Sequence, residues 1–143
     1  MASIEEVDSY LRNIEIFVND LKDKYDGKQS ERILSSHVWM SDMMERTINK
    51  NIIPLANSIR ELRVGYEKKF GSGLQFDFAV KHCSEVRILM SELHSAYKDH
   101  NGIIDIKLKF RHTLPELSSS LNSLRNRVNI IKGNVNRIKN LED

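Results

Sequence analysis

The chain has 143 residues, 40% of them hydrophobic and 29% charged, and a formal net charge of +2. This composition excludes an intrinsically disordered chain, and the length lets one domain over residues 1–143 bury its own core without disulfides or metals. The net charge is too small to indicate a polyanionic partner by itself. Two prolines and six glycines are few helix breakers for this length, so long helices are expected.

The cysteine content and the start of the chain indicate the compartment. One cysteine, Cys83, excludes an internal disulfide framework and suits a reducing environment. No stretch approaches the run of about eighteen apolar residues that a membrane-spanning helix needs. The first residues include Glu5 and Glu6, where a secretory signal carries basic residues. We therefore expect a soluble intracellular protein, with the cytoplasm as its compartment.

The first helix is predicted over residues 3–26. Ser3 and Glu6 have the spacing of a capping box, in which the hydroxyl and the carboxylate each satisfy a free backbone N–H at a helix start. Apolar residues then recur every three or four positions as far as Tyr25, which places them along one side of a helix. Gly27 is expected to end the helix in a left-handed conformation.

The second helix is predicted over residues 30–70. Ser30 is a suitable N-cap, and the next helix breaker after it is Pro54. The apolar spacing keeps its phase across this proline, so we expect one continuous helix that is kinked near Pro54. A break with a turn at residues 49–51 is the alternative.

The part of the chain that follows the Gly-Ser-Gly loop at residues 71–73 has two interpretations. Apolar spacing of three and four predicts a third helix over residues 76–100. Apolar and polar residues also alternate near residues 74–80 and 103–112, which is typical of strands with one wet face. Short β segments there are the alternative, although two isolated strands would be marginal in water.

The final helix is predicted over residues 114–141, with Pro115 in its first turn. Its apolar residues alternate strictly at spacings of three and four, which indicates a narrow seam packed against another helix. We therefore predict an all-α fold, an elongated bundle of three to four long helices with coiled-coil-like packing. The seam and its charged border are the predicted partner-binding residues: Leu117, Leu121, Leu124, Arg125, Arg127, Val128, Ile131, Lys132, Val135, Ile138 and Lys139.

Positive charge gathers along this last part of the chain. Eight lysines and arginines lie from Lys107 to Lys139, with one acid, Glu116. Residues that border a seam select its partner, so the like charges disfavour a parallel pair of such helices and favour an acidic partner. The first helix offers Asp8 and Glu15 at its own bordering positions, which an antiparallel packing within the chain would use. The pattern leaves open whether the seam is filled within the chain or by a partner.

No residue pattern indicates catalysis, a cofactor or a bound metal. The sequence lacks a glycine-rich phosphate loop, a GxSxG elbow and a CxxC pair. The histidines, which lack the spacing of HExxH or paired ExxH metal sites, are His37, His82, His94, His100 and His112. We therefore predict a non-enzymatic protein without cofactor-binding or metal-binding residues.

Two arginine–histidine pairs resemble a ribonuclease motif. In HEPN domains, which are small helical ribonucleases, four to six residues separate an arginine from a histidine. Arg87 with His94, and Arg32 with His37, have this spacing. The resemblance implies cleavage of RNA by such a pair, and we keep this activity as a further alternative.

The expected function is that of a helical protein–protein interaction subunit, or an oligomeric scaffold, in a larger intracellular assembly. The seam would bind a helix of the same or another protein, and the basic border would select it. The alternative is a nucleic-acid-binding protein whose C-terminal helix contacts phosphates without reading bases, because that helix has no aromatic residue. Membrane binding is not expected, because the apolar stripe is narrow and lacks Trp and Phe.

Overall fold

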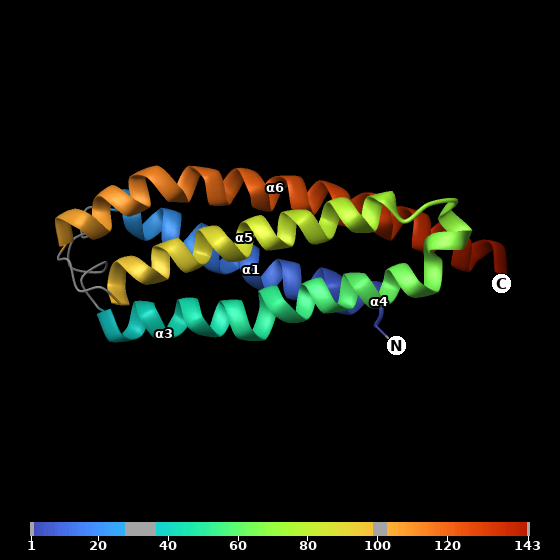
Figure 1. Ribbon diagram of the computed structural model, residues 1–143, viewed down its shortest axis with the longest axis horizontal. Helices are drawn as coiled ribbons and strands as arrows, with labels where there is room; N and C mark the ends of the chain where they lie inside the picture. The colour runs from blue at the N-terminus through green and yellow to red at the C-terminus, as the bar shows by residue number, and fades with distance from the viewer. Residues whose placement is uncertain (1, 28–36, 99–102, 143) are drawn as a thin grey trace.

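The computed structural model describes residues 2–27, 37–98 and 103–142. The fold is an all-α helical bundle, as predicted, in which long helices lie side by side along one direction (Figure 1). The helical elements of the described residues are α1 (Ile4–Asp26), α3 (His37–Thr47), η1 (Ile48–Ile52), α4 (Ile53–Phe70), α5 (Leu74–Lys98) and α6 (Ile103–Glu142). Because α3, η1 and α4 follow one another without a break, these elements make four rods.

The rods alternate in direction along the chain. Each rod runs antiparallel to the one before it, and α6 returns alongside α1, so that both chain ends lie towards the same end of the bundle (Figure 1). α6 packs most extensively on α5 and also contacts α1 and α4. The last rod in the sequence is therefore in contact with all three others.

Local capping chemistry explains where α1 begins. The Ser3 hydroxyl accepts a hydrogen bond from the Glu6 N–H at 3.2 Å, which confirms the predicted N-cap. At the other end, Gly27 is extended, with φ −73°, so the predicted left-handed cap is wrong. Among the glycines that the structure describes, Gly71 is left-handed, with φ 82°, and its N–H bonds to the Lys68 carbonyl at the end of α4.

Pro54 lies inside a continuous rod. The chain passes it through the π-helical turn η1, in which the Ile53 N–H bonds to the carbonyl of Ile48, five residues back. A proline has no N–H and clashes with the preceding helical turn, and a wider π turn accommodates both effects. The rod is unbroken over residues 37–70, so the alternative turn at residues 49–51 is wrong, while residues 30–36 lie outside the described part.

Residues 74–80 and 103–112 are helical, so the alternative of short β segments is wrong. Ile106 and Phe110 are fully buried and continue the three-and-four spacing of α6, whereas Ile104 is 73% exposed. The apolar residues that suggested alternation therefore lie on two sides of one helix. A helix also satisfies its own backbone hydrogen bonds, which two strands without further neighbours would not.

α6 begins at Ile103 rather than at residue 114, so Pro115 lies inside the helix and not in its first turn. Because proline has no N–H, the Arg111 carbonyl loses its usual α-helical donor. The helix continues through this position because packing holds both of its flanks, where Phe110 and Leu117 are fully buried.

Apolar side chains from all four rods form one core. At the end where α6 begins, aromatic rings fill it. Tyr25 stacks on Phe110 with the ring centroids 6.2 Å apart, and Tyr97 meets the same ring edge-on at 6.1 Å. These contacts join α1, α5 and α6 at that end of the bundle.

Cys83 belongs to this core, with 1% of its surface exposed. Burial raises the pKa of its thiol to about 12. Because the thiolate is the reactive form, we expect iodoacetamide at pH 8 to label Cys83 slowly in the folded chain and rapidly in denaturant. Mass spectrometry of the labelled chain measures both rates, and equal rates would contradict the buried position.

Candidate interaction site

The predicted seam of α6 is filled by the chain's own helices. Its buried aliphatic side chains are at most 5% exposed and belong to the common core. They are Leu117, Leu121, Leu124, Val128, Ile131 and Val135, and Ile138 beyond them is half-buried. A partner protein cannot contact the buried side chains while the bundle is folded, so these residues hold the bundle itself together.

Arg125 joins α6 to α1 through two carboxylates. Its guanidinium donates to Asp8 Oδ1 at 2.6 Å and to Glu15 Oε2 at 3.1 Å, and a third hydrogen bond reaches the other Glu15 oxygen. The side chains of Arg125 and Asp8 are only 21% and 15% exposed. The expected antiparallel packing of the first and last helices through Asp8 and Glu15 is therefore confirmed.

The charges of this cluster shift the pKa values of both partners. The hydrogen bond from Arg125 lowers the pKa of Asp8, although partial burial opposes the change. The hydrogen bonds to Glu15 and Asp8 raise the pKa of Arg125. Arg12 at 3.3 Å and Lys132 at 3.9 Å add two cations around the same Asp8 carboxylate. Two predicted border residues, Arg125 and Lys132, thus face carboxylates of α1.

The other border residues of α6 also lie against the bundle. Arg127 donates to Gln75 Oε1 at 3.0 Å, and its guanidinium lies 4.5 Å from the centre of the Phe78 ring on α5. Lys139 is half-buried near the end of α6. The basic border is thus divided between α1 and α5, and it does not form the open row of cations that follows a nucleic-acid backbone.

Arg87 and His94 are seven residues apart on α5, which separates them by about 10 Å along the helix axis. The Arg87 side chain is exposed, whereas His94 Nε2 lies 2.9 Å from the Ser41 hydroxyl of α3. The histidine is thus engaged across the interface between α3 and α5. Of the second resembling pair, Arg32 and the side chain of His37 lie outside the described part of the chain.

The remaining histidines do not gather into one site in the described structure. His82 Nδ1 lies 3.0 Å from Glu85 Oε2, and this hydrogen bond lowers the pKa of the Glu85 carboxyl. His112 is exposed on α6, and His100 lies outside the described residues. In residues 2–27, 37–98 and 103–142, no group of three or more His, Cys, Asp or Glu side chains is arranged to hold a metal ion.

A groove that sequence reasoning missed lies between the last turns of α1 and the first half of α6. Its deeper part is a cavity of about 210 Å³ that is lined by Lys22, Tyr25, Asp26, Phe110, Arg111, Leu114, Pro115 and Ser118. A shallower part shares Tyr25, Asp26 and Arg111 and adds Ile104, Lys107 and Leu108. The two parts together are called the end groove.

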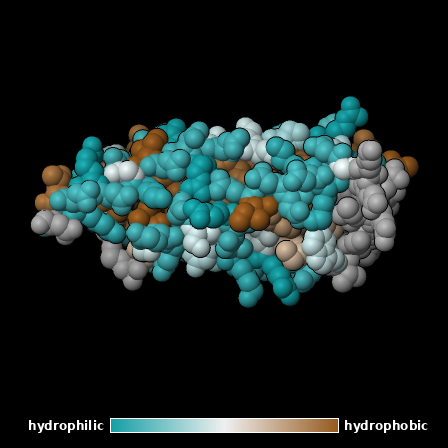
Figure 2. All heavy atoms as spheres, turned by 180° about the vertical axis from the view of Figure 1, so that it is seen from behind, coloured by the Kyte–Doolittle hydropathy of each residue, from teal (hydrophilic) through white to brown (hydrophobic). Residues whose placement is uncertain are grey.

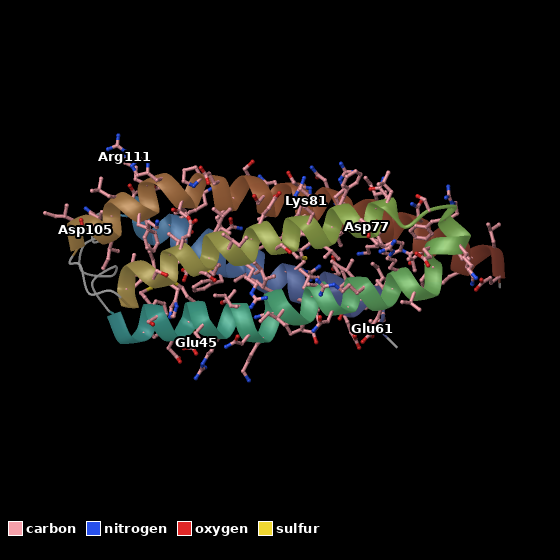
Figure 3. The ribbon with its side chains drawn as sticks, in the orientation of Figure 1. Glu45, Glu61, Asp77, Lys81, Asp105 and Arg111 are labelled. Carbon is pink, nitrogen blue, oxygen red and sulfur yellow. The ribbon has the colours of Figure 1, made fainter. Side chains whose placement is uncertain are left out.

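The end groove combines an apolar floor with exposed aliphatic side chains and a charged rim. The stacked rings of Tyr25 and Phe110 form its floor. Ile104 and Leu108 lie four residues apart on one side of α6 and are 73% and 46% exposed. Arg111 points away from the bundle on the rim (Figure 3).

The alternation near residues 103–112 was the sequence signal for this groove. A surface helix that buries one side carries polar residues on the other. Here aliphatic residues occur on both sides, since Ile106 is buried while Ile104 and Leu108 are exposed among charged residues. Figure 2 shows that hydrophobic patches on the opposite face of the molecule are small and separated, and that one lies at the end where α6 begins.

Fold and site together define an all-α helical bundle with an apolar groove at one end. Comparison of the chain with protein-family models, curated proteins and solved structures found no match. Within the described residues, no helix has both the length and the apolar character that crossing a membrane requires.

Proposed function

We propose that this chain is a non-enzymatic interaction subunit that binds an amphipathic, acidic helix of another protein in the end groove. The observation that carries the proposal is the exposure of Ile104 and Leu108 beside a cavity with an aromatic floor. Complete burial of such side chains contributes about 1.5–3 kcal/mol each. A partner helix that placed apolar side chains every three or four residues into the groove would cover both.

The charges around the end groove favour an acidic partner. Lys22 and Arg111 line it, and Asp26 is the one carboxylate among the described residues of its lining. Acidic residues on the flanks of a bound helix would meet these cations, which raises the association rate and fixes the orientation more than it raises affinity. We therefore keep the acidic partner inferred from the sequence. We assign its contact surface to the end groove instead of the seam.

Selection of peptides tests this proposal. Phage-displayed amphipathic helical peptides with acidic flanks are selected on the immobilised full chain, and the affinity of enriched peptides is measured by fluorescence polarisation. We expect the double variant Ile104→Glu, Leu108→Glu to weaken binding at least about tenfold, because it removes apolar contacts and adds repulsion.

A matched control uses two exposed aliphatic residues at the other end of the bundle. Val64 and Leu141 are 83% and 81% exposed, and the double variant Val64→Glu, Leu141→Glu adds the same charge there. This control should bind the selected peptides as the unchanged chain does. The proposal fails when no peptide prefers the unchanged chain over the Ile104→Glu, Leu108→Glu variant.

A further inference from the structure

A second hollow lies on another side of the bundle, between α4 and α5. It is a cavity of about 110 Å³, and its lining residues differ from those of the end groove. Its floor includes Ile52 and Cys83, which are both 1% exposed. The exposed side chains of Arg60 and Arg87 lie at its rim, one from each rod. We call it the arginine hollow.

The π turn explains why the rods leave space at this position. η1 ends at Ile52, and Ile53 begins α4, and both residues line the arginine hollow. A π turn carries an extra residue per turn, so it shifts the side chains that follow relative to a regular helix. The small side chain of Ala56 leaves part of this space unfilled. Such turns occur frequently at functional sites.

The charge pattern at the arginine hollow differs from that near the connection between α4 and α5. Where α4 and α5 approach near their connection, Arg63 of α4 bonds to Asp77 of α5 at 2.8 Å. At the arginine hollow both rods present a base, and the lining contains no carboxylate. Arg87 forms no ion pair with any residue that the structure describes, and Arg60 donates to the amide oxygen of Asn57 at 3.2 Å.

Arg60 and Arg87 are both exposed at the rim of one hollow, so solvent screens their mutual repulsion, and an anion between them would interact favourably with both. Two guanidinium groups offer a fork of donors that suits a carboxylate or a phosphate. The space beneath them has an apolar floor, since Ile52, Ala56 and Cys83 line it. The volume of the arginine hollow is larger than a single water needs and suits a short aliphatic chain. The anionic head of a small molecule would therefore lie between the arginines, and its aliphatic tail would lie on the apolar floor.

We propose that the arginine hollow binds a small organic carboxylate, whose anionic head lies between Arg60 and Arg87 and whose short aliphatic part fills the hollow. The amide of Asn57, held by Arg60, lies beside the head group. This site is separate from the end groove, so it does not depend on the proposed protein partner.

Titration of the ¹⁵N-labelled full chain by NMR tests the site. The probes are sodium isovalerate, sodium acetate and inorganic phosphate, with ionic strength held constant by sodium chloride. We expect isovalerate to shift the backbone amide signals of Ile53, Asn57 and Ser84 and to saturate in the millimolar range. Acetate should bind more weakly, because it leaves the hollow empty.

Three single variants decide between this site and general anion attraction. Arg60→Gln and Arg87→Gln should each weaken isovalerate binding at least about tenfold, because each removes charge-assisted hydrogen bonds. Lys81→Gln, an exposed base on α5 that does not line the hollow (Figure 3), removes the same charge and should leave binding unchanged. Circular dichroism checks that all three fold.

Three results would overturn the proposal. The first is the absence of saturable shifts with isovalerate. The second is phosphate binding as tight as isovalerate binding, which would mean that the apolar floor contributes nothing. The third is an equal loss of affinity in Lys81→Gln and in the two rim variants.

Discussion

Replacing Val128 by aspartate is expected to unfold the bundle. Val128 is fully buried at the centre of the α6 seam. An unpaired charge in such a place costs at least about 3–5 kcal/mol, which is comparable to the total stability of about 5–15 kcal/mol of a typical domain. Circular dichroism and urea titration should therefore show a largely unfolded or strongly destabilised chain.

Ile130→Asp is the matched control for this variant. Ile130 lies two residues further along α6 and is 43% exposed. The aspartate there can stay hydrated, so its effect should remain within about 1 kcal/mol. If a partner helix filled the seam instead, Val128→Asp would dissociate the assembly, and the folded protomer would have a smaller mass than the assembly. Light scattering after size-exclusion chromatography would detect that result, which would contradict the burial of the seam within the chain.

Replacing Arg125 by methionine is expected to have the second large effect on stability. It keeps much of the aliphatic stem but leaves Asp8 and Glu15 without the guanidinium that bonds to both. The cluster is largely shielded from solvent, so we expect a loss of about 1–3 kcal/mol in the free energy of unfolding at pH 7. Arg12→Met, which removes a base from the same Asp8 but whose side chain is 68% exposed, should cost about 0.5 kcal/mol or less.

The effect of Arg125→Met should depend on pH. The pKa of Asp8 is lower in the folded chain than its ordinary value of 3.8. Its contribution to stability is therefore present above about pH 4 and is lost as the pH falls through the folded pKa. Urea titrations at pH 7 and at pH 3 should show a smaller difference between the unchanged chain and the variant at pH 3. A difference that grew at pH 3 would contradict the role of the Asp8 carboxylate.

The ion cluster at Arg125 was predicted correctly from the seven-residue spacing of the apolar residues. The residues that border two apolar stripes follow from spacing alone, so the sequence is sufficient to match Asp8 and Glu15 with Arg125. The continuity of the rod past Pro54 was also predicted, because the apolar phase is the same before and after it. The form of that passage, a π turn, could not be predicted, since it depends on how the flanking turns pack.

The two errors at the start of α6 have a common physical cause, which is packing against the neighbouring rods. At residues 103–112, one set of aliphatic residues satisfies a period of two and a helical period at once, so the choice depends on what packs against each side. Ile106 and Phe110 face the core, while Ile104 and Leu108 do not. Pro115 was expected to mark a helix start, but packing on both sides outweighs its one missing hydrogen bond.

The sequence by itself determined that the chain is helical, where the apolar stripes run, and which charges border them. These are properties of a single chain and its periodicity. Only the tertiary structure decided that the seam is filled within the chain, and that space remains at the end groove and beneath Arg60 and Arg87. A groove remains where neither of two neighbouring rods supplies a side chain that fills the space between them, and that depends on residues distant in sequence.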